Sequence, residues 1–127
     1  MDKKVRQQVL DKYYGHCAYC GCQLTMKTLQ VDHIKPILRG WEFADEQRGE
    51  DDIDNYFPSC APCNRRKGTE SVEGFRHELE MCHQRMMNTN ANYRQLVRYG
   101  QIKLINDGKV EFYFEKVNRA NKVSGVE

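Results

Sequence analysis

Two pairs of cysteines have the spacing that most clearly predicts chemistry. Cys17 and Cys20 form one C-x-x-C pair, and Cys60 and Cys63 form the other. Four thiolates are the number that a closed tetrahedral zinc site requires, and a tight turn within each pair lets both sulfurs reach one ion. We therefore predict a structural zinc ion, which would join the two ends of a long excursion of the chain and add to the free energy of folding. The alternative interpretations are free buried cysteines or a redox pair.

The remaining two cysteines are Cys22 and Cys82. Cys22 follows two residues after the first pair and could replace Cys20 as a ligand, but the symmetric pairing favours Cys20. Cys82 falls on the apolar stripe of a predicted helix, so we expect it in the core. The chain starts with Met1-Asp2-Lys3-Lys4, shows no export signal and contains no apolar run near the ~20 residues of a membrane span. These features argue against disulfides and predict a cytoplasmic protein with no membrane partner.

Four polar residues near the cysteine pairs could carry out hydrolysis: Asp32, His33, Asn55 and Asn64. A zinc ion that joined the pairs would bring the segment with Asp32 and His33 close to Asn64. Asp32 and Asn64 offer oxygen ligands, which suit Mg²⁺ or Mn²⁺ better than a second zinc. His33 can take a proton from water near neutral pH. A hard cation beside a general base is the equipment for metal-assisted hydrolysis of a phosphodiester.

Simpler interpretations exist for each of these residues. Asp32 and His33 could be an ordinary half-buried pair on a strand, which points neighbouring side chains to opposite faces. Asn55 could shape a turn, and Asn64 could cap a helix. Their joint occurrence with the cysteine spacing and with the basic run Arg65-Arg66-Lys67 favours catalysis.

Charge is distributed unevenly although the formal net charge is only +2. Arg65, Arg66 and Lys67 could hold phosphates on either side of a cut. Further basic residues follow in the chain, namely Arg76, Arg85, Arg94, Arg98 and Lys103. A separate acidic stretch over 42–54 contains Glu42, Asp45, Glu46, Glu50, Asp51, Asp52 and Asp54. A basic face with a separate acidic loop can bind a polyanion, although an ordinary solvated surface also accounts for the pattern.

The motifs, taken in order, resemble a known family. The string "CAYC … VDHIKP … DN … CAPCNRRKG" over about residues 15–75 resembles the HNH endonucleases whose ββα-metal site is braced by a four-cysteine zinc. The resemblance implies that His33 is the general base and that Asp32 binds the catalytic divalent metal. It implies that Asn55 supports the loop and helps to orient His33, and that Asn64, where the family often has His, completes the metal site. An Asn oxygen favours harder ions such as Mg²⁺ or Mn²⁺.

The implied activity is hydrolysis of DNA, in double-stranded form, by a metal-dependent endonuclease that leaves a 5′-phosphate and a 3′-hydroxyl. Two other functions fit parts of the sequence. A non-catalytic zinc module could bind nucleic acid through the basic residues, and a protein-interaction domain could use the acidic 42–54 loop.

The hydrophobic pattern predicts an α+β fold. The predicted elements are helices over 3–14, from Cys60 to Gly68, over 71–87 and over 91–99, a strand over 28–34, a loop over 38–54, and a C-terminal β-hairpin that turns at Asp107-Gly108 between arms around 102–104 and 110–114. We expect one HNH nuclease domain over 1–117, with its core at about 15–75 and an extension over 76–117. Residues 118–127 are predicted to form a flexible tail.

Overall fold

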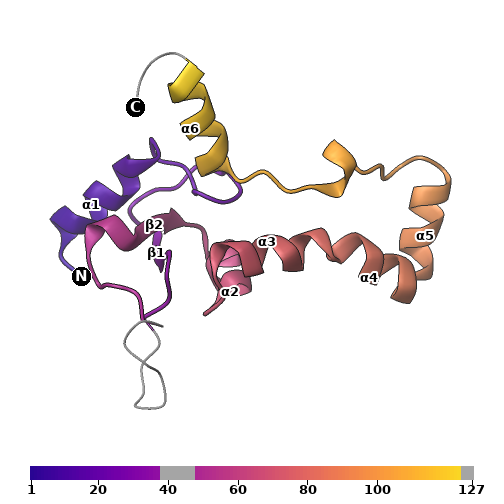
Figure 1. Cartoon of the computed structure of the whole chain (residues 1–127), viewed down its shortest axis with the longest axis horizontal. Helices are drawn as coiled ribbons and strands as arrows, with labels where there is room; N and C mark the ends of the chain where they lie inside the picture. The colour runs from indigo at the N-terminus through magenta and orange to yellow at the C-terminus, as the bar shows by residue number, and fades with distance from the viewer. Residues whose placement is uncertain (38–47, 124–127) are drawn as a thin grey trace. The chain divides into compact units, whose positions relative to one another are not determined.

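The computed structural model describes residues 1–37 and 48–123 (Figure 1). The greater part of the predicted 38–54 loop, residues 38–47, therefore lies outside the described residues. The chain divides into two compact units, Met1–Val72 with Glu111–Glu127, and Glu73–Val110. Within the described ranges, no helix has the length and apolar character needed to cross a membrane.

A two-stranded antiparallel sheet lies at the centre of the first unit. Strand β1 (Gln30–His33) pairs with β2 (Tyr56–Ser59), so that Gln30 lies opposite Ser59 and His33 opposite Tyr56. All four residues of β2 are buried, whereas only Asp32 is fully buried in β1. The sheet thus has one strand in the core and one strand that borders solvent.

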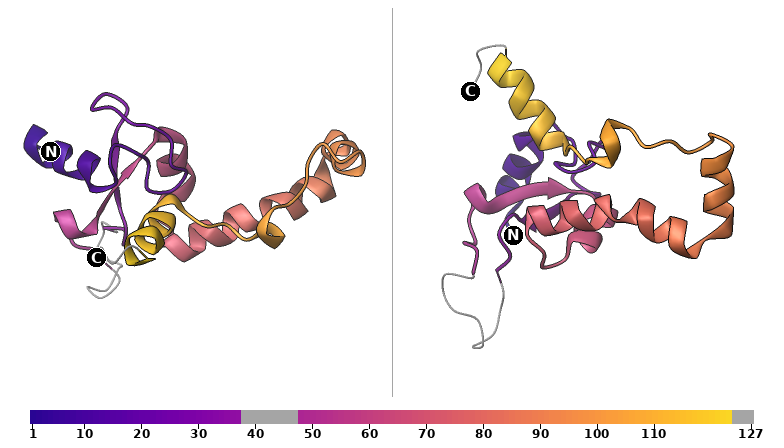
Figure 2. Two further views of the ribbon diagram at one scale, coloured as in Figure 1. Left: turned by 90° about the horizontal axis from the view of Figure 1, so that it is seen from above. Right: turned by 45° about the vertical axis from the view of Figure 1, so that its right-hand side comes forward.

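Helix α1 (Lys3–Lys12) packs against β2 (Figures 1 and 2). Asp2 caps its first turn by accepting a hydrogen bond from the Lys4 N–H, which is the usual role of an aspartate at this position. Val9 and Leu10 form its buried face. At its C-terminal end the Lys12 ammonium donates to the Tyr56 carbonyl at 2.7 Å and lies over the Phe57 ring.

The segment after α1 carries the first cysteine pair and is attached directly to β2. The Cys17 N–H donates to the Cys22 carbonyl, and the Ala18 N–H donates to the Pro58 carbonyl. Gly21 adopts a φ of +81°, which closes the turn and which other residues rarely adopt. The first pair is therefore held beside the strand that leads to the second pair.

Helix α2 (Ala61–Lys67) follows the second strand and packs against β1. Pro62 lies in its first turn, where a missing N–H costs nothing, and Gly68 ends it with a φ of +55°. The predicted helix from Cys60 to Gly68 is therefore confirmed.

The C-terminal segment returns to the first unit as α6 (Tyr113–Val123). The Tyr113 N–H and Phe114 N–H donate to the carbonyls of Tyr19 and Ala18. The ring of Tyr19 lies 5.1 Å from that of Phe112, which is buried, and 6.4 Å from that of Phe114. Part of the predicted tail, residues 118–123, is thus helical.

The predicted C-terminal β-hairpin is wrong. A tight turn does form, with positive φ at Asn106 and Asp107, one residue before the predicted turn. The following arm does not pair with the first, because side chains take its backbone groups. The Val110 N–H donates to Glu80, the Val110 carbonyl accepts from Arg76, and the Phe112 N–H donates to Glu115.

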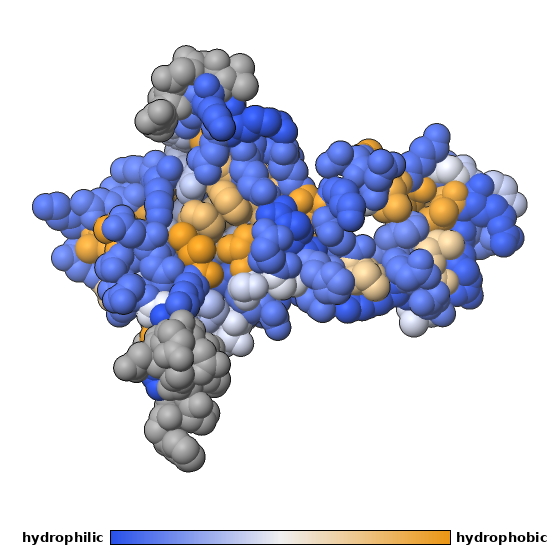
Figure 3. All heavy atoms as spheres, viewed as in Figure 1, coloured by the Kyte–Doolittle hydropathy of each residue, from blue (hydrophilic) through white to orange (hydrophobic). Residues whose placement is uncertain are grey.

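The second unit is helical. The helix predicted over 71–87 is divided at Met81 into α3 (Val72–Glu80) and α4 (Cys82–Thr89). Helix α5 (Ala91–Arg98) is capped by Asn90 and agrees with the helix predicted over 91–99. Figure 3 shows apolar atoms gathered on the surface around α5. The exposed apolar residues of the second unit include Leu96, Leu104 and Ile105. Mixed α and β structure, with a cluster of four cysteines, confirms the predicted fold class.

Candidate metal centre and active site

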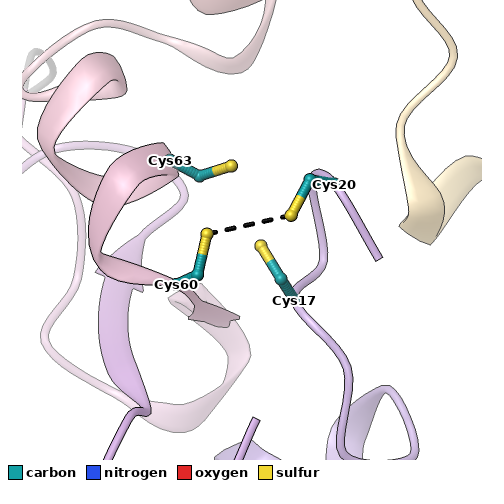
Figure 4. Close-up of side chains that lie close together, drawn as sticks. All are labelled: Cys17, Cys20, Cys60 and Cys63. Atoms are coloured by element: carbon teal, nitrogen blue, oxygen red, sulfur yellow. Dashed lines mark hydrogen bonds between the residues drawn. The ribbon is translucent and has the colours of Figure 1, made fainter. Parts of the chain in front are cut away.

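The four cysteines of the two C-x-x-C pairs converge (Figure 4). The sulfurs of Cys17, Cys20, Cys60 and Cys63 all lie within 4.8 Å of one another. Figure 4 shows the second pair on the first turn of α2 and the first pair on the facing loop. The predicted cluster is therefore formed by two pairs that lie far apart in the chain, since Cys20 and Cys60 are separated by 40 positions.

The spacing of the sulfurs fits a tetrahedral zinc ion. The Cys20 and Cys60 sulfurs lie 3.8 Å apart. Tetrahedral geometry with Zn–S distances of about 2.3 Å requires S···S distances of about 3.8 Å. Cys17 is fully buried, Cys60 and Cys63 are half-buried, and Cys20 is exposed. The donor set therefore fits a zinc-type structural metal.

The electrostatics of the cluster also suit a cation. The pKa of Cys17 is lowered to about 4, because the Cys63 thiol donates to its sulfur and the backbone N–H groups of Cys20, Cys60 and Tyr19 point toward it. In return the Cys17 thiolate raises the pKa of Cys63 well above its usual range. A bound metal would supply the positive charge that stabilises the thiolate form of all four cysteines.

Cys22 lies outside this set of four. Its carbonyl accepts the Cys17 N–H within the knuckle, so its backbone helps to shape the turn. Cys82 donates to the Glu78 carbonyl within the helical unit. Among the described residues, the metal-type cluster contains only the two predicted pairs.

Asp32 is buried in a network of donors. Its side chain is 3% exposed, Oδ2 accepts from the Tyr19 hydroxyl at 2.5 Å, and Oδ1 accepts from the Lys67 ammonium at 3.2 Å. Lys67 also donates to the His33 carbonyl. Burial raises the pKa of Asp32, and the bonds from Tyr19 and Lys67 oppose this shift. Lys67 thus supplies positive charge at the carboxylate that was predicted to bind a divalent ion.

The side chain of Asn64 lies beside the same strand. Its Nδ2 donates to Gln30 Oε1 at 2.8 Å, which leaves the amide oxygen outside this bond. Gln30 and Asp32 point to the same face of β1, since side chains repeat every two residues in a strand. Asn64 and Lys67 are three residues apart on α2 and therefore also share a face. The oxygen atoms of Asp32 and Asn64 are suitable ligands for a hard cation. One of them, Oδ1 of Asp32, already accepts a hydrogen bond from Lys67.

His33 lies at the other end of the sheet from the cysteines and borders solvent. Its side chain is 24% exposed, and Nε2 lies 3.0 Å from Oδ1 of Asp51. The His33 ring meets the Tyr56 ring edge-on at 5.2 Å, and the Tyr56 hydroxyl donates to the same Asp51 oxygen at 2.6 Å. The hydrogen bond to this carboxylate raises the pKa of Tyr56 to about 12.

Asn55 joins the segment that follows His33 to the segment that carries Glu50. Its Oδ1 accepts the Lys35 N–H, and its Nδ2 donates to the carbonyls of Lys35 and Glu50. Its own carbonyl accepts the Ile34 N–H. These contacts fix the backbone just after His33 and the backbone next to Asp51, rather than the imidazole itself.

The basic run is divided between solvent and core. Arg65 and Arg66 are exposed on α2, whereas Lys67 is 1% exposed and bonded to Asp32. The prediction that all three contact phosphate therefore needs correction for Lys67, because its ammonium is used inside the protein. An α-helix has 3.6 residues per turn, so the side chains of three consecutive residues point in different directions and cannot all face one partner.

Three residues around the predicted site were not singled out from the sequence. Tyr19 bonds Asp32, and Asp51 and Tyr56 contact His33. The acidic 42–54 stretch was noted only for its charge, yet Asp51 within it faces the imidazole. Tyr56 could have been found from the strand pairing, since it lies directly opposite His33.

Comparison with protein families agrees with this geometry. Residues 17–70 match the model of the HNH endonuclease family. The matched segment contains both cysteine pairs, both strands and α2. This confirms the resemblance that the sequence motifs predicted.

Among solved structures, the chain is similar to the Type II-C Cas9 enzyme from Actinomyces naeslundii. The sequence identity is 21%, the TM-score is 0.49, and the alignment covers 76% of this chain. The chain spans 12% of the length of that Cas9 chain. No curated protein matches this chain.

Proposed function

We propose that this chain is a metal-dependent DNA endonuclease that hydrolyses phosphodiester bonds, with His33 as the general base. The observation that carries the proposal is the partly exposed His33 imidazole, which lies within the HNH-matched segment and is held by an adjacent carboxylate. A base of this kind must be reachable by water and must also be oriented. Both conditions are met at this end of the sheet.

The residues of the chain divide the proposed reaction among them. His33 takes a proton from water, the water oxygen forms a bond to phosphorus, and the bond from phosphorus to the 3′ oxygen breaks. The 3′ oxygen then takes a proton from solvent, which leaves a 3′-hydroxyl and a 5′-phosphate. Arg65 and Arg66 are exposed beside the site on α2 and can contact flanking phosphates.

Asp32 and Asn64 are the residues proposed to hold the catalytic cation. When bound, Mg²⁺ or Mn²⁺ would supply positive charge at the phosphate and at the leaving oxygen. An ionised carboxylate offers about four lone-pair directions, so the contacts from Tyr19 and Lys67 leave acceptor capacity on Asp32. The cysteine cluster is proposed to bind zinc and to hold α2 against the loop that bears the first pair.

One observation favours a second candidate, a zinc module that binds nucleic acid without cutting it. Lys67 is an internal cation already paired with Asp32, and such a pair can replace a metal as the partner of a buried carboxylate. In this case Arg65 and Arg66 would still bind phosphates.

Incubation with supercoiled plasmid distinguishes the two candidates. We expect nicking or linearisation that requires Mg²⁺ or Mn²⁺, with no loss of zinc from the protein. Defined duplex, nicked and single-stranded substrates would then test the proposed preference for double-stranded DNA. Gel retardation without cleavage across the whole metal series would contradict the nuclease and support the binding module.

A further inference from the structure

The imidazole of His33 is held from two sides by residues outside the HNH motif letters. Asp51 Oδ1 lies 3.0 Å from Nε2, and the Tyr56 ring stands perpendicular to the imidazole at an interplanar angle of 89°. A contact at one nitrogen together with an aromatic wall restricts both rotation and displacement of the ring.

Asp51 is itself held in place. The Tyr56 hydroxyl donates to the same carboxylate oxygen that contacts His33. The backbone next to Asp51 is fixed from the other side, because Asn55 donates to the carbonyl of Glu50. Asp51 therefore presents its oxygen to His33 from a defined backbone position, although 66% of its side chain is exposed.

The chemistry of these groups determines which nitrogen carries the proton. An ionised carboxylate only accepts hydrogen bonds, so the short contact requires Nε2 of His33 to be the donor. In the neutral imidazole the other nitrogen, Nδ1, is then the acceptor. A histidine that lacked this partner could exchange between both tautomers, and only one tautomer presents a free lone pair to a given water.

We propose that Asp51 is a positioning residue that holds His33 in its Nε2–H tautomer, so that Nδ1 is the atom that accepts the proton from the attacking water. The proposal rests on the proposed function for its kinetic consequence, but the tautomer can be observed without it. Tyr56 supports the arrangement by holding the Asp51 carboxylate.

Imidazole nitrogen spectra test the structural part. In protein labelled with ¹⁵N-histidine, a long-range ¹H–¹⁵N correlation spectrum reports the tautomer of each ring, and the His33→Ala spectrum assigns the His33 signals. We expect the Nε2–H form for His33 in the wild type and a mixture of tautomers in Asp51→Ala. An unchanged His33 tautomer in Asp51→Ala would overturn the proposal.

Kinetics test the consequence on plasmid or duplex DNA. We expect kcat to fall about 10- to 100-fold in Asp51→Ala with KM unchanged, by analogy with the loss found when the carboxylate partner of a metal-binding histidine is removed. Asp51→Asn keeps an oxygen acceptor of the same size and should lose less. Tyr56→Phe keeps the ring but releases the carboxylate, and we expect a smaller loss than in Asp51→Ala.

Asp54→Ala is the matched control, because it removes a carboxylate from the same segment and no contact with His33. Equal losses in Asp54→Ala and Asp51→Ala would overturn the proposal in favour of a general charge effect. A rise in the Mg²⁺ concentration needed for half-maximal rate, specific to Asp51→Ala, would also overturn it and indicate that Asp51 binds the metal. If the wild type cuts no DNA but Asp51 controls the tautomer, the contact stands and the nuclease proposal fails separately.

Discussion

The two ends of the β1–β2 sheet differ in burial, in charge and in the kind of partner that they hold. At the Ser59 end the strand leads into Cys60, and the sulfurs converge beside a fully buried Cys17. At the opposite end His33 and Asp51 are accessible to solvent. Each strand has only four residues, so the two ends are about 10 Å apart.

Under the proposed function, this difference would separate the metal that stabilises the fold from the residue that reacts. The cysteine end joins segments that are distant in the sequence, whereas the histidine end leaves a titratable ring in contact with water. Asp32 and Lys67 lie between them as a buried ion pair. Substitutions in the cysteine cluster, at His33 and in the Asp32–Lys67 pair should therefore differ in their effects on stability and on activity.

Loss of the metal at the cysteine end should have the largest effect. Structural zinc sites contribute about 10–16 kcal/mol of apparent binding free energy, which is more than the stability of a typical domain. We expect Cys60→Ser to lose zinc, measured by elemental analysis, and to lose the cooperative thermal transition in circular dichroism. Cys82→Ser, outside the cluster, should keep both, and a Cys60→Ser protein that melted like the wild type would argue against a structural zinc site.

A change at the histidine end should remove activity and leave the fold intact. We expect His33→Ala to cut plasmid about 10²- to 10⁴-fold more slowly, because general base catalysis contributes a factor of this size. Zinc content, melting temperature and DNA retardation should stay as in the wild type. His77→Ala in the helical unit is the control, and wild-type cleavage by His33→Ala would refute the assigned base.

The ion pair between the two ends should affect stability more than DNA binding. Lys67→Ala leaves the Asp32 carboxylate buried, with the Tyr19 hydroxyl as its side-chain donor among the described residues, and breaking a buried pair in this way costs about 3–5 kcal/mol. Urea unfolding measures this loss. The double variant Lys67→Ala with Asp32→Ala should recover part of it, and a Lys67→Ala protein as stable as Arg65→Ala would show that the pair contributes little.

The exposed arginines of α2 should have the smallest effect. We expect Arg65→Ala and Arg66→Ala each to weaken DNA binding modestly and to reduce the salt dependence of log K by about 1. Fluorescence anisotropy at several salt concentrations measures the slope. Lys67→Met changes a buried position, so the folded variant should keep the wild-type salt dependence of log K. An equal change in all three variants would contradict the conclusion that Arg65 and Arg66 face solvent while Lys67 does not.

Local patterns predicted much of the framework. The C-x-x-C spacing predicted the cysteine cluster, and the Pro62 and Gly68 positions agree with the bounds of α2. The prediction of a hairpin was wrong because residues such as Asp107 and Gly108 form a turn whether or not the segments on either side pair as strands. Arg76, Glu80 and Glu115 satisfy the backbone of the second arm instead, and these partners come from helices that turn signals do not report.

By itself the sequence determined which residues can bind metal or move protons, because ligand chemistry and short spacings depend on residue type and local turns. Only the tertiary structure decided that Asp51 faces His33, that Lys67 is buried on Asp32, and that Phe112 packs on Tyr19. Those contacts join residues 18 to 93 positions apart in the chain. Which residues form these contacts depends on the free energy of removing both partners from water when the segments pack. A local sequence pattern contains no information on that free energy.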